Sequence, residues 1–86
     1  MGRKNDTNMT LSYLQKHSLT LSGHRTSVAL EPDFWEVLEE IASSQQQTLA
    51  SFIAELDSQR DSQQPLSSVL RLEALRFLRK NQKNNL

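Results

Sequence analysis

Residues 24–42 read HRTSVALEPDFWEVLEEIA, and this stretch decides the fold because its hydrophobic period changes partway along it. Before the proline, Val28 and Leu30 alternate with small residues, which is typical of a strand with one buried face. After it, apolar residues recur at helical spacing, and proline suits the first turn of a helix. The stretch therefore predicts a strand that ends at Leu30 and a helix from Pro32 to Ser44.

The residues before this strand give a weaker signal. Residues 18–23 contain leucine and threonine and end at Gly23, where we expect a bulge or bend, so the stronger strand prediction begins at His24. Residues 1–17 are polar and lack a sustained period, and this predicts a flexible N-terminal arm.

Two more helices are predicted downstream. Thr48 can cap a helix that begins in the sequence TLASFIAELD and runs to about Arg60. Its apolar face consists of Leu49, Phe52, Ile53 and Leu56. After a second polar break, Ser67 or Ser68 can cap a third helix that runs to about Asn81. The third helix has a broad apolar arc, which indicates contacts with more than one neighbour. The predicted domain thus covers 18–81, and a disordered tail follows over 82–86.

One strand per chain predicts a dimer. A lone strand leaves its backbone donors and acceptors unpaired, and 86 residues without cysteine or a metal-binding cluster form only a thin core. A second copy can supply the missing strand under two-fold symmetry. We therefore expect a mainly α fold with one β-strand per chain, in an intertwined homodimer with a two-stranded antiparallel intermolecular ribbon.

Charge is segregated along the chain although the formal net charge is zero. Residues 1–30 carry four basic groups and one acid, residues 31–61 carry eight acids and one basic group, and residues 62–86 carry five basic groups and one acid. A neutral protein can therefore have a basic face, which is compatible with a polyanionic partner.

The segments HRTSVALEPDFWEVLEEIA, TLASFIAELD and LSSVLRLEALRFLRK together resemble the ribbon-helix-helix family of DNA-binding proteins of the MetJ and Arc type. Within this family, the sequence is similar to a bacterial branch with an extra C-terminal helix, and the resemblance covers roughly Ser18 to Lys80. It implies that paired strands lie in the DNA major groove, and that amides at the start of the second helix bind phosphate.

Strand alternation assigns the faces of the predicted ribbon. If Val28 and Leu30 point into the core, then Arg25, Ser27 and Ala29 point outward, and a dimer presents six such side chains. Arg25 can donate two hydrogen bonds to guanine, Ser27 can bond several base edges, and Ala29 offers a methyl group suited to thymine. Related sequences often carry a polar residue where this chain has Ala29. A solvated charge is the alternative role for Arg25.

The resemblance implies phosphate binding by the main chain at Gln47, Thr48 and Leu49, although Thr48 can equally act as a simple helix cap. Arg3 and Lys4 in the arm can add phosphate contacts or merely keep the terminus hydrated. Trp35 and Phe34 lie in a helical pattern, so we interpret them as core or interface aromatics.

The inventory of reactive groups argues against an enzyme. His17 and His24 lack a cysteine or carboxylate at metal-ligand spacing, and the chain has no glycine-rich phosphate loop. We therefore expect no cofactor and no metal. No stretch suggests a membrane span or a secretory signal, which predicts a cytoplasmic protein associated with the nucleoid when bound to DNA.

Two functions remain open at this point. The first is a sequence-specific, homodimeric DNA-binding protein, a bacterial transcriptional regulator whose partner is double-stranded DNA. The alternative is a dimeric protein-protein interaction module, antitoxin-like or an adaptor without strong DNA specificity, that binds a protein partner through the C-terminal helix. The acidic middle segment and the small side chain at Ala29 favour this alternative.

Overall fold

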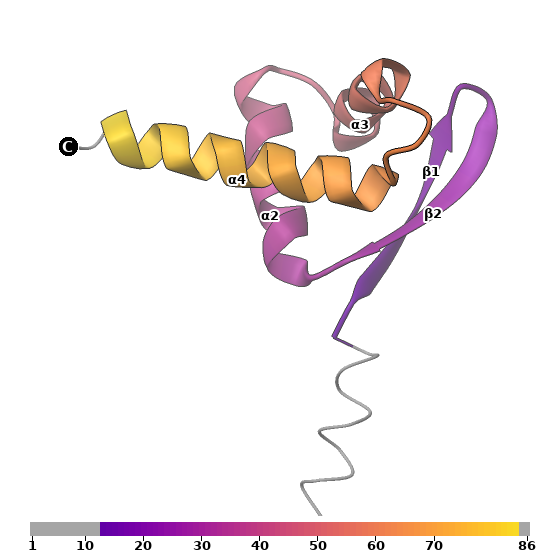
Figure 1. Ribbon diagram of the computed structural model, residues 1–86, viewed down its shortest axis with the longest axis horizontal. Coiled ribbons are helices and arrows are strands. Elements are labelled where there is room, and N and C mark those ends of the chain that lie inside the picture. Colours follow the sequence, from indigo (N-terminus) through magenta and orange to yellow (C-terminus); the bar gives the residue numbers. More distant parts are fainter. Residues whose placement is uncertain (1–12, 85–86) are drawn as a thin grey trace, which may run out of the picture.

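A computed structural model of the protein describes residues 13–84. The elements follow one another as β1 (Gln15–Leu21), β2 (His24–Leu30), α2 (Pro32–Ser44), α3 (Leu49–Gln59) and α4 (Leu66–Asn84). The two strands form a hairpin at one side of the three helices, and α4 crosses α2 with its C-terminal half directed away from the hairpin (Figure 1). None of the helices in the described part of the chain has the length and apolar character needed to cross a membrane.

Both strands of the sheet come from one chain, which corrects the prediction of one strand per chain. β1 and β2 are antiparallel, and the pairing runs from Gln15 opposite Leu30 to Leu21 opposite His24. One edge of β2 therefore finds its hydrogen-bond partners without a second copy. β1 begins at Gln15, so the predicted arm over 1–17 extends three residues too far toward the domain.

A two-residue turn joins the strands where a bulge or bend was expected. Ser22 has a φ of 52° and Gly23 a φ of 82°, so both central residues are in the left-handed region. These signs are those of a type I′ turn, whose twist matches that of the two strands it connects. Gly23 thus reverses the chain, and this reversal places the upstream segment, β1, beside β2 as its pairing strand.

Two of the helices, α2 and α3, begin where the sequence predicts. α2 has proline in its first turn, and the side chain of Thr48 caps α3 by accepting a hydrogen bond of 3.1 Å from the Ser51 amide. α4 differs at both ends. It starts at Leu66, before the expected caps at Ser67 or Ser68, and it continues to Asn84, so residues 82–84 are helical where a disordered tail was predicted.

The core lies between the inner face of the hairpin and the three helices. Leu30, Leu38, Ile53 and Leu70, one from β2 and one from each helix, are fully buried. β1 adds Leu19 and Leu21, and α2 adds Trp35. One chain therefore encloses a core to which every element contributes.

Candidate nucleic-acid interface

The solvent-facing side of the hairpin is the candidate interface. Alternation along β2 turns Val28 and Leu30 inward, and it leaves Arg25 and Ser27 exposed and Ala29 half-buried, as predicted. Alternation along β1 turns three more side chains outward. In cross-strand order, the outer face consists of the pairs Lys16 and Ala29, Ser18 and Ser27, and Thr20 and Arg25. A single chain thus presents the six side chains that were expected from two.

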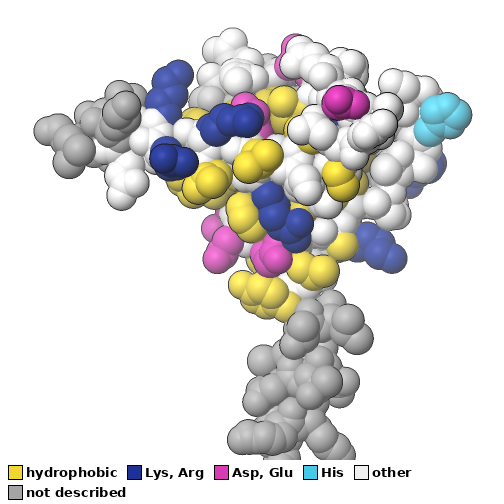
Figure 2. Space-filling model, in the orientation of Figure 1, with side chains coloured by type: hydrophobic (Ala, Val, Ile, Leu, Met, Phe, Trp, Pro, Cys, Tyr) yellow, Lys and Arg dark blue, Asp and Glu magenta, His cyan; other side chains and the backbone are white. Residues whose placement is uncertain are grey.

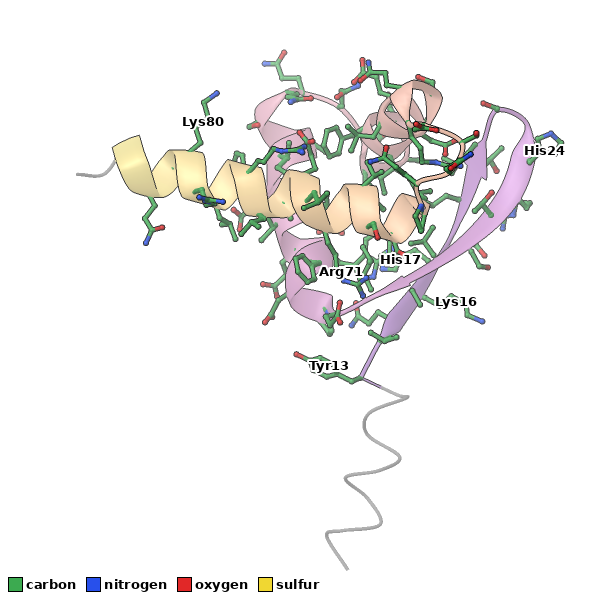
Figure 3. The ribbon with its side chains drawn as sticks, viewed as in Figure 1. Tyr13, Lys16, His17, His24, Arg71 and Lys80 are labelled. Atoms are coloured by element: carbon green, nitrogen blue, oxygen red, sulfur yellow. The ribbon has the colours of Figure 1, made fainter. Side chains whose placement is uncertain are left out.

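A cation lies at each end of this outer face. Near the turn, Arg25 Nη1 donates to Thr20 Oγ1 at 3.4 Å, a long contact that orients the guanidinium and leaves its other donors free. At the opposite end, Lys16 is directly across the ladder from Ala29 and projects away from the helices (Figure 3). Ala29 therefore has a lysine opposite it on the neighbouring strand.

Trp35 of α2 fixes the strand position of Lys16. Its Nε1 donates to the Gln15 carbonyl at 2.8 Å, and its ring stacks on His17 with centroids 3.8 Å apart and planes at 13°. Because Trp35 is buried, these contacts hold the residues on both sides of Lys16 against the helical layer. The intervening side chain must then point outward. The prediction that Trp35 is a core aromatic is confirmed.

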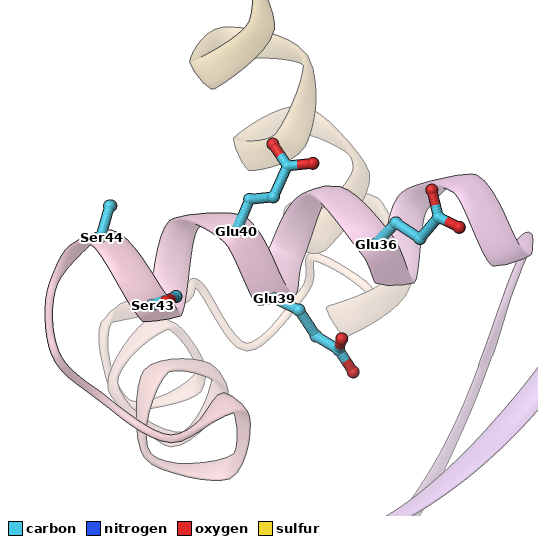
Figure 4. Close-up of a pocket in the computed structure, with 5 residues that line it drawn as sticks. All are labelled: Glu36, Glu39, Glu40, Ser43 and Ser44. Carbon is cyan, nitrogen blue, oxygen red and sulfur yellow. The ribbon is translucent and has the colours of Figure 1, made fainter.

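The electrostatic character of the hairpin differs from that of α2. Residues 13–30 contain no aspartate or glutamate, so the charges of Lys16 and Arg25 are not offset within the hairpin. Carboxylates instead line an open depression on α2, together with two serines (Figure 4); its lining consists of Glu36, Glu39, Glu40, Ser43 and Ser44. A polyanion is therefore repelled from α2 and attracted to the hairpin.

The start of α3 has amides available to an anion. The Phe52 amide donates to the Thr48 carbonyl at 3.0 Å, and the Ser51 amide donates to the Thr48 side chain. The first amides of the helix, including that of Leu49, have no protein acceptor in the described residues. The Gln47 side chain donates to Ser51 Oγ at 3.3 Å, so it contributes to α3 itself.

The structure does not bring every predicted site residue together. Gln47, Thr48 and Leu49 belong to the helical layer, and α3 contacts β1 on the side opposite the outer face. The Leu49 side chain packs on the core, so only its main chain is open to a ligand. Arg3 and Lys4 lie outside the described residues.

An ion pair at the junction of strand and helix holds α4 in place. Arg71 donates two hydrogen bonds to Glu31 Oε1, from Nε at 3.0 Å and from Nη2 at 2.8 Å. The Arg71 hydrogen bonds lower the pKa of the Glu31 carboxyl below its ordinary value. The Arg71 guanidinium also lies 5.6 Å from the ring centroid of Phe34. α4 is thereby fixed to the residue that connects β2 with α2.

Comparison with known proteins agrees with this geometry. The family model described as a ribbon-helix-helix domain matches residues 14–78, and the chain belongs to this family. Among solved structures, the chain is similar to an uncharacterized protein from Bordetella pertussis Tohama I, with 32% sequence identity and a TM-score of 0.71. The alignment covers 87% of this chain and 64% of that chain, so it includes less than two thirds of the Bordetella protein. No curated protein matches the chain.

The sequence interpretation missed the contribution of β1 to the outer face. Ser18, Thr20 and Lys16 were assigned to a weak segment and to the arm. One signal could have found them, since Ser22 and Gly23 separate two stretches of seven residues that each have apolar side chains at the fifth and seventh positions. Glycine at such a centre is typical of a two-residue hairpin turn.

Proposed function

We propose that this protein binds double-stranded DNA through the outer face of the β1–β2 hairpin. The observation that carries the proposal is the outer face itself, which is polar, lacks acids and has a cation at each end, Lys16 and Arg25. The major groove of B-form DNA admits a two-stranded ribbon. Membership in the ribbon-helix-helix family supports DNA binding in general.

Each residue pair has a role in this proposal. Arg25 donates to guanine or to a phosphate, with Thr20 holding its guanidinium. Ser18 and Ser27, at the centre of the face, exchange hydrogen bonds with base edges. At the end away from the turn, Ala29 has no polar group to contact DNA, and Lys16 on the opposite strand provides a positive charge there.

Two further regions add contacts with phosphate. The main-chain amides of Thr48 and Leu49 at the start of α3 favour an anion through the helix dipole and their free donors, whereas the Gln47 amide already donates to the Ala42 carbonyl. Arg3 and Lys4 are proposed to bind the backbone from the N-terminal arm. These contacts position the hairpin, while base contacts provide sequence preference.

We propose further that the protein is a bacterial transcriptional regulator that works as a homodimer in the cytoplasm, next to the nucleoid. The reason for dimerisation changes with the structure, because β1 already pairs with β2 and buries Leu19 and Leu21. Each copy therefore keeps its own hairpin, and two copies place two hairpins on repeated half-sites. The role is non-catalytic, as is typical of this family.

Selection of bound duplexes from a random DNA pool, with the purified full chain, tests the proposal. We expect a short motif to be enriched, and we expect affinity for it to fall steeply as salt rises, because bound phosphates release counterions. A failure to bind any duplex at low salt would refute DNA binding. Binding without an enriched motif would limit the function to DNA attachment without regulation of specific sites.

A further inference from the structure

The exposed side of α4 has an apolar stripe that no element of the described chain covers. Leu72, Leu75 and Leu78 are 42%, 45% and 45% exposed, and their spacing of three residues places them along one side of the helix. The opposite side is used in the core, where Leu70 and Ala74 are fully buried. α4 is therefore apolar on two sides, and only one of them has a partner.

Positive charge accompanies this leucine stripe. Arg71 is neutralised by Glu31 at 2.8 Å, and Arg76 contacts Glu73 at 3.5 Å. Arg79 and Lys80 form no ion pair within residues 13–84, since the ion pairs there involve other residues. The space-filling view shows hydrophobic and basic side chains next to one another over α4 (Figure 2).

We propose that the leucine stripe binds an acidic amphipathic helix of another protein. Such a helix places apolar residues at i, i+3 and i+4 against the leucines and carboxylates beside Arg79 and Lys80. Apolar contact supplies the affinity, and the charges select acidic over basic partners. This activity is separate from the proposed DNA binding and does not depend on it.

Charge complementarity favours an acidic helix over three other occupants of the leucine stripe: a second copy of the chain, residues 1–12 and DNA. In a second copy, α4 carries the same excess of positive charge, so two such helices repel one another. The acidic depression on α2 of a second copy offers carboxylates and serines but no apolar side chain to meet the leucines. Residues 1–12 carry more basic than acidic groups. DNA satisfies the cations but leaves the leucines in water.

The position of the leucine stripe allows it to act while the hairpin is occupied. α4 extends away from the hairpin toward its C-terminal end (Figure 1). Leu75 and Leu78 lie beyond Leu70, whose side chain is in the shared core. A protein bound there leaves the outer face of the hairpin free for DNA.

A binding measurement with a designed peptide tests this proposal. The probe is a fluorescein-labelled amphipathic helix with leucine at i, i+3, i+4 and i+7 and glutamate at most other positions. One control peptide has the same composition in scrambled order, and a second has lysine in place of glutamate. We expect the full chain to bind the first peptide and to bind both controls at least about tenfold more weakly.

Variants of the chain locate the binding site. Leu75→Ser should weaken binding of the glutamate peptide by about tenfold or more, because it removes the central leucine. Arg79→Glu should weaken binding of the glutamate peptide and strengthen binding of the lysine peptide. Tyr13→Ala, which removes a 53% exposed aromatic side chain next to β1, should leave peptide affinity unchanged. Circular dichroism verifies that each variant is folded.

Three outcomes would overturn the proposal. Equal binding of the three peptides would show that the stripe has no preference for an acidic helix. A self-associated chain that Leu75→Ser dissociates would assign the stripe to a second copy. A loss of DNA affinity in Leu75→Ser, without peptide binding by the unmodified chain, would assign α4 to DNA. Failure of DNA binding alone leaves the peptide result unaffected, so the two proposals fail separately.

Discussion

At Arg25, the guanidinium is 3.4 Å from the hydroxyl of Thr20 on the neighbouring strand, and this contact pre-orients a side chain that has donors to spare. The outward direction of Arg25 was predictable from alternation with Val28 and Leu30. The contact with Thr20 was not, because it depends on the register between two strands. The place of Lys16 opposite Ala29 was not predictable for the same reason, since it exists only in the hairpin.

Arg25 should contribute both affinity and base preference. We expect Arg25→Ala to weaken binding to a selected duplex by about 1 to 3 kcal/mol and to relax preference at one base pair. Arg25→Lys keeps the charge but loses the planar pair of donors, so it should retain more affinity than Arg25→Ala while losing base preference. Fluorescence anisotropy with matched and mismatched duplexes checks both. Unchanged base preference in both variants would remove Arg25 from base recognition.

Glu31 provides a pH-dependent contribution to stability. Because Arg71 lowers its pKa below the ordinary value of 4.5, Glu31 stabilises the fold at pH values above that value. The contribution is lost as the pH falls through the lowered pKa. We therefore expect Glu31→Gln to reduce the free energy of unfolding at neutral pH, with a difference from the unmodified chain that shrinks at acid pH.

Denaturant unfolding of both proteins across this pH range measures the difference. Glu39→Gln is the matched control, because Glu39 is an exposed acid on the adjacent helix α2 without an ion pair in the described residues. A Glu31→Gln difference that stays constant with pH, or that matches the control, would contradict the proposed role of the Arg71 contact.

Among the elements, the helices were more predictable from sequence than the sheet. Pro32 and Thr48 set the starts of α2 and α3 through local chemistry, a fixed φ and a capping oxygen. β1 lacks such a signal, because its first half is polar and His17 becomes an inward residue only by stacking on Trp35. The first half of β1 therefore has no periodicity of its own, and only the turn at Ser22 and Gly23 and the alternation in the second half indicate the strand.

The end of α2 is set by local hydrogen bonds of the backbone. The Gln46 amide donates to the Ser43 carbonyl and the Gln47 amide to the Ala42 carbonyl, at 3.0 and 2.9 Å. This pair of bonds is a Schellman motif, which requires a left-handed residue at Gln46. Glutamine at a φ of 58° is strained there, whereas Gly23 occupies its left-handed position without strain.

These two left-handed positions give a pair of opposite expectations. Gly23→Ala should lower the free energy of unfolding by about 1 to 2 kcal/mol, because the added Cβ meets no neighbour but opposes the backbone conformation. Gln46→Gly should raise it by about 0.5 to 1 kcal/mol. Denaturant titration of both variants checks the signs. A neutral Gly23→Ala would argue against the type I′ turn, and with it the hairpin.

At the scale of the whole molecule, one chain contains both the ribbon and the core beneath it. The small size of the chain and the absence of cysteine pointed to a dimer, but the prediction relied on a strand count that the structure corrects. Leu30, Leu38, Ile53 and Leu70 are fully buried within a single copy. We therefore expect the proposed dimer to serve function, with each chain folding on its own.

We expect the midpoint of thermal unfolding to level off at high dilution, where the proposed dimer has dissociated and a folded single chain remains. A protein that folds only as a dimer becomes more stable as its concentration rises, because association is coupled to folding. Scanning calorimetry over a wide range of dilutions distinguishes the two cases. A midpoint that keeps falling on dilution, without reaching a plateau, would show that the chain needs a partner to complete its fold.

The central claim is that the outer face of the hairpin binds DNA, and two double variants of equal charge test it most directly. Lys16→Ala with Arg25→Ala removes both hairpin cations, while Arg79→Ala with Lys80→Ala removes two cations from α4. On a selected duplex, we predict at least about tenfold lower affinity for the hairpin variant and a dependence of log K on log salt that is shallower by about 2. The α4 variant should remain close to the unmodified chain. Equal losses in the two variants, or no loss in the hairpin variant, would contradict the account.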